Sequence, residues 1–119
     1  MADYLPKFKP GQAVTFTASA DVTGGRLVAV TGNRTVGPAG ADSAAVVGVA
    51  GFDAKNGERV TVFTRAGGVQ ALTAAGVIAA GAPVTAAANG KATTGGTNII
   101  GLALGAAAAD NDVIDVLFI

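Results

Sequence analysis

The sequence predicts an all-β fold, a sandwich or a barrel of short strands, and three features indicate it. Short runs of apolar and β-branched residues recur along the chain and are bounded by Gly, Asn and Asp, a pattern typical of strands and turns. These turn signals recur every ~8–12 residues, which is the spacing of sandwiches and barrels. Apart from residues 105–109, where a short helical turn stays open, no segment has the apolar periodicity of a helix.

The two halves of the chain resemble each other, with matching residues 53 to 56 positions apart. The matched pairs are Gly25 and Gly81, Asn33 and Asn89, Gly48 and Gly101, and Phe63 and Phe118. Two copies are too few for a solenoid, so the pattern favours one pseudo-symmetric β domain with an internal pseudo-duplication. Chance resemblance between two halves rich in Gly, Ala and Val is the alternative interpretation.

The first half predicts strands that differ in how they are covered. The first alternates, with Val14 and Phe16 on one face and threonines on the other. Residues 46–50 are nearly all apolar, as in a strand covered on both faces. Asn56-Gly57 is the strongest hairpin signal, and an alternating strand follows it. The expected strands are residues 13–17, 27–30, 35–36, 46–50 and 59–64.

The second half is expected to repeat this arrangement. Residues 73–81 are ambiguous between a single helical turn and a bend, because glycines near both ends disfavour a longer helix. The expected strands are residues 69–72, 84–86, 91–93, 99–104 and 113–118.

Composition limits the classes of function. A chain of 119 residues is long enough for one domain with a buried core. Eight Lys and Arg balance eight Asp and Glu, which argues against a nucleic-acid binder, because such proteins depend on a basic surface. Charged residues make up only 13% of the chain. Such a surface repels its own kind weakly and suits a protein that packs against others.

The chain has no Cys and no His. This excludes disulfides and thiolate chemistry and argues against zinc sites and His-dependent catalysis. Glu58 is the one glutamate, so a paired-carboxylate hydrolase would need two aspartates brought together by the fold. We therefore expect no enzymatic activity, no metal and no cofactor.

The mean hydropathy of +0.52 raises the question of a membrane segment. Residues 66–90 and 92–109 form two uncharged runs on either side of Lys91, but Gly, Thr and Asn interrupt both runs. A spanning helix needs about 20 predominantly apolar residues. We therefore expect no membrane segment, and the N-terminus also lacks the apolar core of a signal peptide. The chain is expected to be made and kept in a reducing cytoplasm before assembly.

Three aspartates near the end of the chain, Asp110, Asp112 and Asp115, permit two interpretations. One is a calcium loop, but the spacing of an EF-hand is absent. The other, which we favour, is a solvated turn with Asp115 on the polar face of the last strand. The scattered arginines are interpreted as solvated strand-face or interface residues; they are Arg26, Arg34, Arg59 and Arg65.

The first ten residues differ from the rest, because aromatic, apolar and basic side chains alternate between two prolines. Proline restricts its own φ and the residue before it, so this segment is expected to be extended. A frayed tail is the alternative. The expected division is an N-terminal arm at residues 1–11 and a β domain at residues 12–119. The candidate contact residues of the arm are Tyr4, Leu5, Pro6, Lys7, Phe8 and Lys9.

Several runs of residues resemble the small head-decoration (capsid cement) proteins of tailed double-stranded DNA phages. The resemblance covers nearly the whole chain from about Pro10. It is carried by Lys-Pro-Gly-Gln-Ala-Val-Thr-Phe-Thr-Ala at 9–18, by Val-Thr-Gly-Gly-Arg-Leu-Val at 22–28, by 47–50, 54–62, 76–84 and 100–104, and by the terminal Val-Leu-Phe-Ile.

This resemblance implies a compact β-barrel or β-tulip-like domain that forms a homotrimer on the outer capsid surface of the virion, at threefold and quasi-threefold positions. It also implies binding to the major capsid protein and stabilisation of the expanded shell against the pressure of packaged DNA. In such families an N-terminal arm can reach a neighbouring subunit, which would suit residues 4–9. The alternative function is a module that binds a host surface or a glycan. That alternative lacks support from an aromatic platform, because there is no Trp and Tyr4 lies in the arm.

Overall fold

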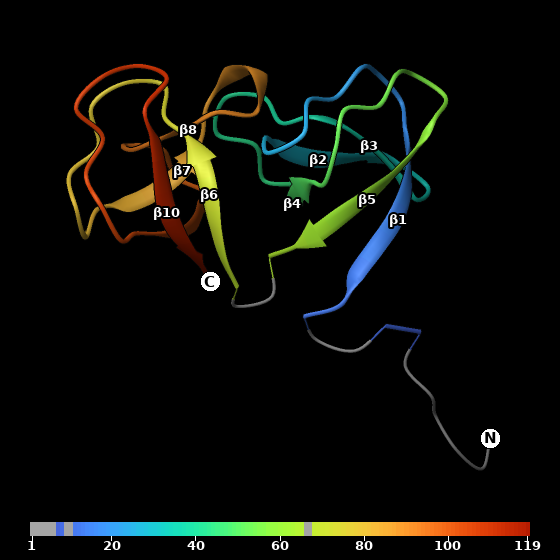
Figure 1. Cartoon of the computed structure of the whole chain (residues 1–119), viewed down its shortest axis with the longest axis horizontal. Coiled ribbons are helices and arrows are strands. Elements are labelled where there is room, and N and C mark those ends of the chain that lie inside the picture. The colour runs from blue at the N-terminus through green and yellow to red at the C-terminus, as the bar shows by residue number, and fades with distance from the viewer. Residues whose placement is uncertain (1–6, 9–10, 66–67) are drawn as a thin grey trace, which may run out of the picture.

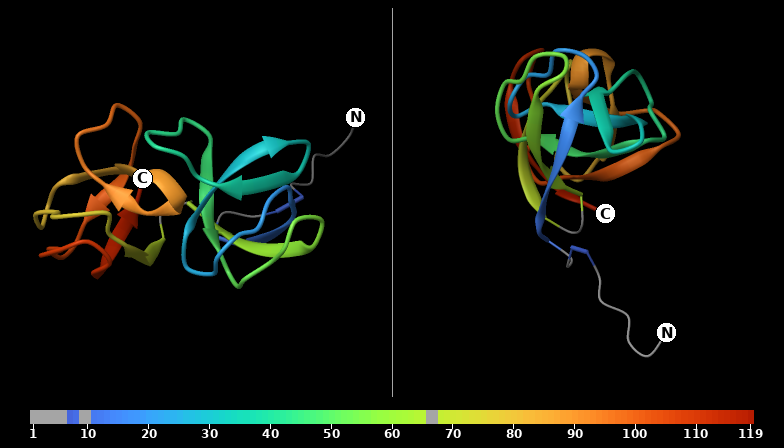
Figure 2. Two further views of the ribbon diagram at one scale, coloured as in Figure 1. Left: turned by 90° about the horizontal axis from the view of Figure 1, so that it is seen from above. Right: turned by 90° about the vertical axis from the view of Figure 1, so that its right-hand side faces the viewer.

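The computed structural model describes residues 7–8, 11–65 and 68–119. The described chain is all-β and forms two units that lie side by side (Figures 1 and 2). The first unit contains β1 (Ala13–Ala18), β2 (Leu27–Gly32), β3 (Thr35–Pro38), β4 (Val46–Ala50) and β5 (Arg59–Thr64). The second contains β6 (Val69–Thr73), β7 (Pro83–Ala86), a 3₁₀ turn η1 (Ala88–Gly90), β8 (Ala92–Thr93), β9 (Ile99–Ala103) and β10 (Val113–Phe118).

The first unit is a closed barrel with the strand order β1-β3-β2-β4-β5. β5 returns to pair with β1 in antiparallel fashion, from Ala13 opposite Phe63 to Thr17 opposite Arg59. On its other side β1 runs parallel to β3, with Ala18 opposite Val36. Closure leaves the barrel without a free edge strand, which is how small β proteins avoid edge-to-edge aggregation.

The second unit has the strand order β6-β10-β9-β7-β8. Because β6 to β10 correspond in turn to β1 to β5, this is the order of the first unit read in the opposite direction around the barrel. Its closing contact is a single parallel bridge between Ala74 and Ala92, where the first unit pairs Ala18 with Val36. Both residues of the bridge lie 56 positions after their counterparts. The predicted pseudo-duplication is therefore confirmed, and chance resemblance between the halves is wrong.

Smaller features repeat as well. A bridge outside the strands joins Val22 to Ala54 in the first unit, and its counterpart joins Ile78 to Ala107 in the second. The same close contact between strands explains the matched glycines Gly48 and Gly101. A Cβ at Gly101 would lie 2.5 Å from the carbonyl oxygen of Leu117, and one at Gly48 would overlap that of Phe63. Neighbouring strands approach too closely at these two positions for any side chain.

One predicted match is wrong by a single residue. Phe63 pairs with Ala13 and Val49, and the residue with the corresponding pairings in the second unit is Leu117, not Phe118. Since successive side chains of a strand point to opposite faces, the shift of one residue places Phe63 and Phe118 on opposite faces of their sheets. Phe63 is 46% exposed, whereas Phe118 is buried.

Two clusters of buried side chains form the core. The smaller one fills the barrel and includes Phe16, Val28 and Val60. The larger one fills the second unit and continues into the first through Leu27, Val46 and Val49. β4 contributes to both clusters, because Ala50 faces the barrel interior. The expectation that residues 46–50 are covered on both faces is confirmed.

The ambiguous segments contain no helix. Thr73 ends β6, and residues 74–81 and 105–109 form bends and turns that the Ile78–Ala107 bridge connects. Asn56-Gly57 does form a turn, but the connection from β4 to β5 spans residues 51–58 and is not a two-residue hairpin. The Gly57 N–H instead donates to the Ala18 carbonyl oxygen at 2.8 Å. In the described part of the chain no helix has the length and apolar character needed to cross a membrane.

Candidate functional site

The arm is described in part. Tyr4, Leu5, Pro6 and Lys9 lie outside the described residues, and Lys7 and Phe8 are both exposed. Phe8 is 43% exposed, which is similar to Phe52 at 49% and Phe63 at 46%. An exposed aromatic side chain at this position supplies apolar area for contact with another molecule.

Arg34 connects the arm to the barrel. Its guanidinium carbon lies 5.2 Å from the centre of the Phe8 ring and 5.7 Å from that of Phe16 on β1. Both distances fall in the range of a cation–π interaction. Arg34 occupies the turn between β2 and β3 with a φ of 54°. Sequence reasoning did not connect it with the arm, because only the parallel pairing of β1 with β3 brings the two together.

A hollow of about 310 Å³ surrounds this contact. It is lined by Phe8, Thr15, Phe16, Thr17, Arg34 and Arg59. Arg59 lies opposite Thr17 in the β1–β5 ladder. The hollow therefore combines two guanidinium groups, two hydroxyls and aromatic surface, and no carboxylate of the described residues lines it. Such a lining can receive carboxylate or main-chain oxygens of a partner.

A second surface feature is an open groove of about 420 Å³ in the first unit. Its lining is mainly apolar and includes Val30, Val47 and Arg65. The Arg65 guanidinium donates to the main-chain oxygens of Val46, Ile99 and Ile119 at 3.2, 3.4 and 3.2 Å. Arg65 thus joins β4 of the first unit to β9 and to the end of β10 in the second.

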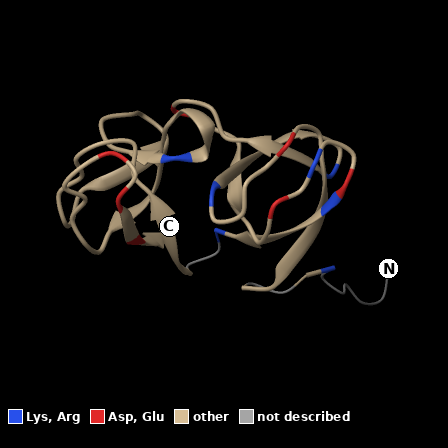
Figure 3. Cartoon of the chain, turned by 45° about the horizontal axis from the view of Figure 1, so that its top comes forward, with Lys and Arg blue, Asp and Glu red and all other residues tan. Residues whose placement is uncertain are grey.

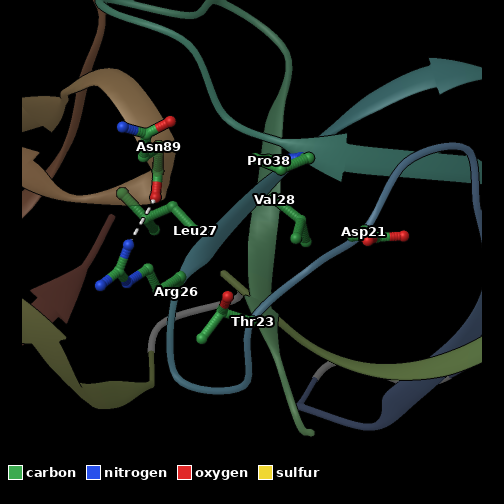
Figure 4. A pocket seen from close by; sticks show the side chains of 7 residues that line it. All are labelled: Asp21, Thr23, Arg26, Leu27, Val28, Pro38 and Asn89. Carbon is green, nitrogen blue, oxygen red and sulfur yellow. Dashed lines mark hydrogen bonds between the residues drawn. The ribbon is translucent and has the colours of Figure 1, made fainter. Parts of the chain in front are cut away.

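A third hollow, of about 200 Å³, lies where β2 meets η1 (Figure 4). Arg26 donates to the main-chain oxygen of Asn89 at 3.4 Å across this junction. Asp21 and Thr23 add polar groups to the lining. The Asp21 carboxylate is already used locally, because it accepts from the main-chain N–H of Asn56 at 2.9 Å.

The acidic turn is held by contacts within the chain. Asp112 accepts from the main-chain N–H groups of Ala108 and Ala109, at 2.9 and 3.2 Å. Asp110 forms a salt bridge of 3.2 Å with Lys91, the one salt bridge among the described residues. Charged residues are otherwise dispersed over both units (Figure 3). No group of three potential ligand side chains lies close enough to hold a metal in the described part.

Comparisons with known proteins agree over most of the chain. A family model described as phage cement protein matches residues 8–118. A solved structure, the head fiber gp8.5 N base of bacteriophage phi29, superimposes with a TM-score of 0.73 and 19% sequence identity. That match covers 91% of this chain and 93% of the phi29 chain, and at this identity it is a likeness of fold. No curated protein matches the sequence.

Proposed function

Because this chain belongs to the phage cement protein family, we propose that it binds the outer surface of an assembled phage capsid and stabilises the expanded shell against the pressure of packaged DNA. Membership makes it a structural, capsid-associated virion protein. The observation that carries the proposal is the extent of the family match, which begins at Phe8 and includes both units.

The physical basis of cementing is preferential binding. A protein that binds only the assembled shell stabilises that state by mass action. Many copies, each bridging neighbouring shell subunits, convert modest contacts into a large collective effect. The low fraction of charged residues supports this role, because dense packing on a lattice then involves little repulsion between copies.

The finer parts of the proposal concern partners. The major capsid protein would be the binding partner, and the chain would assemble on it as a homotrimer. Residues 1–11 would act as a contact arm and residues 12–119 as the body of the protein. Phe8 supports this role for the arm, since it is exposed and shares a hollow with two arginines that no carboxylate of the described chain lines. In this role the protein needs no catalytic activity.

Mixing purified protein with expanded capsids tests the proposal. Co-sedimentation should show saturable binding at micromolar protein, and the capsid disruption temperature should rise with occupancy. Deleting residues 1–10 should weaken binding while leaving the unfolding transition of the β domain in place. Absence of association with expanded capsids at these concentrations would contradict the proposed function, and equal binding by the truncated protein would contradict a role for the arm.

A further inference from the structure

The four arginines of the chain form two pairs with different surroundings. Arg26 and Arg65 lie at the junction of the two units, where each donates to main-chain oxygens of the second unit. Arg34 and Arg59 are exposed and line the same hollow of the first unit, beside Phe8. Neither side chain forms a hydrogen bond or salt bridge with a carboxylate of the described residues. The second pair therefore presents two positive charges at the surface of the first unit.

The acidic residues of the first unit are used elsewhere. Each of the four that the structure describes accepts a hydrogen bond from a main-chain N–H group. The pairs are Asp21 with Asn56, Asp53 with Gly24, Glu58 with Lys55, and Asp42 with Asn98. These carboxylates stabilise loops and turns. The described chain thus leaves both arginines of the hollow available to a partner.

The internal repeat shows that the two arginines are not part of the framework of the fold. The counterpart of Arg34 is Gly90, 56 positions later. The counterpart of Arg59 is Val113, which pairs with β6 as Arg59 pairs with β1. The second unit has the same neighbouring strands without either arginine. The fold therefore does not require a guanidinium at these positions.

Arg34 also has a backbone conformation that favours glycine. Its φ is 54°, in the left-handed region, and its counterpart Gly90 has a φ of 72°. The other described non-glycine residues in this region are aspartate or asparagine, which tolerate it better than arginine does. Residues held in such a conformation by their surroundings occur often at functional sites. Here the rings of Phe8 and Phe16 lie 5.2 and 5.7 Å from the guanidinium carbon and hold it at the hollow.

We propose that the hollow around Arg34 and Arg59 receives an acidic side chain, an aspartate or a glutamate, of the capsid protein. The proposal rests on the proposed function and deepens it by naming the chemistry that recognises the shell. Guanidinium groups bind carboxylates through paired N–H donors. The hydroxyl groups of Thr15 and Thr17 line the same hollow and can donate to the same carboxylate. Because the aromatic rings already hold Arg34, less conformational freedom is lost on binding.

A neighbouring copy of this chain is a poorer source of the acid. The second unit has three aspartates, and two of them are already held within the chain. Asp110 forms the salt bridge with Lys91, and Asp112 accepts from two main-chain N–H groups. Asp115 remains, and its replacement is included in the test below.

Full-length variants that remove one positive charge each test the site. Arg34→Asn suits a left-handed φ, and Arg59→Gln keeps a side chain of similar polarity. Lys55→Gln is the matched control, because Lys55 is exposed in the first unit and lies outside the hollow. At about 50 mM salt each arginine variant should bind expanded capsids about fivefold more weakly, and the control less than about twofold. The differences should shrink at about 500 mM salt, because salt screens exposed charges.

Thermal unfolding separates a binding role of Arg34 from a structural one. Arg34→Asn should leave the unfolding midpoint unchanged or raise it, because asparagine adopts this backbone conformation more readily. Arg34→Lys should bind capsids with intermediate affinity, because it keeps the charge and loses the paired donors. A loss of binding that always accompanies a lower unfolding midpoint would assign Arg34 to the stability of the turn and overturn the proposal.

Modification of arginine side chains by phenylglyoxal, followed by mass spectrometry, locates the contact. Arg34 and Arg59 should react about fivefold more slowly on capsids than in the free protein, whereas Arg26 at the junction should react equally in both. Equal rates for Arg34 and Arg59 on and off capsids would overturn the proposal. So would protection in the free protein that Asp3→Asn or Asp115→Asn abolishes, because an acid of this chain would then fill the hollow.

Failure of this proposal and failure of the proposed function give different results. Native affinity of both arginine variants for capsids would contradict this proposal alone. Absence of capsid binding by the native protein would contradict the proposed function, and this proposal with it.

Discussion

Asn98 donates two hydrogen bonds to Asp42 across the junction of the two units, one from its main chain and one from its side chain. The Asn98 main-chain N–H donates to the Asp42 carboxylate at 2.8 Å, and the Asn98 side-chain amide donates to the Asp42 carbonyl oxygen at 2.9 Å. The Thr97 N–H donates to the same carboxylate at 3.0 Å. The loop before β4 is thereby joined to the loop before β9.

This arrangement predicts a dependence of stability on pH. The main-chain N–H groups of Asn98 and Thr97 favour the ionised form and lower the pKa of Asp42 below its ordinary value of 3.8. A lowered folded-state pKa adds stability above the unfolded-state pKa, and that stability is lost as the pH falls through the folded-state pKa. Asp42→Ala should therefore lower the unfolding midpoint at pH 7, and the difference from the native protein should shrink below pH 3.8.

Thermal unfolding followed by circular dichroism between pH 2.5 and 7, at about 0.1 M salt, checks this prediction. Asp42→Asn is the matched control, since it keeps the shape but cannot ionise. A difference between the native protein and Asp42→Ala that persists unchanged at the lowest pH would show that the carboxylate charge is not the cause.

The matched glycines give a prediction about close strand packing. Gly101→Ala should destabilise the protein by about 1–3 kcal/mol or more, because the new Cβ would meet the Leu117 carbonyl and the backbone must move. Gly48→Ala should behave in the same way. Gly105→Ala is the control, because a Cβ there meets no atom within 4 Å. Urea unfolding measures all three, and equal free energies of unfolding for Gly101→Ala and Gly105→Ala would refute the explanation.

The hydrogen bonds of Arg65 across the junction predict that its replacement lowers the free energy of unfolding. Arg65→Met keeps much of the apolar stem but leaves the carbonyl oxygens of Val46 and Ile99 without their donor. The free energy of unfolding should fall by about 1–3 kcal/mol. Arg59→Met should change it by less than about 0.5 kcal/mol, because Arg59 is exposed and its side chain forms no hydrogen bond or salt bridge with the other described residues. Similar losses for both arginines would argue against a specific role of Arg65.

The exposure of Phe8 predicts that its replacement affects capsid binding and leaves the thermal stability of the protein unchanged. Phe8→Ala should weaken capsid association about tenfold by removing exposed apolar area from the contact, while the unfolding midpoint stays nearly constant. Phe52→Ala is the matched control, because Phe52 is exposed to a similar extent in the loop after β4. Capsid co-sedimentation over a protein titration measures both variants. An equal loss of capsid affinity with Phe52→Ala would contradict a specific role of the arm in binding.

The candidate site was only partly visible in the sequence. The alternation of aromatic and basic residues between two prolines singled out residues 4–9. Nothing in the sequence connected Phe8 with Arg34, 26 positions later, because their contact depends on which strand lies beside β1. The exposure of Val69 and Leu102 was also missed, since both resemble core residues until the register assigns each to a face of the sheet.

Alternation, turn residues and repeat spacing can be read along the chain, so the β class, most strand positions and the doubling could be predicted from the residues alone. How each unit closes could not be predicted in this way, because it depends on contacts between distant strands. The first unit closes through a ladder between β1 and β3, whereas the second has one bridge at Ala74 and Ala92 and shares its core with Leu27 and Val49. The reason is that burial depends on what packs against a strand, and equivalent strands in the two units have different neighbours.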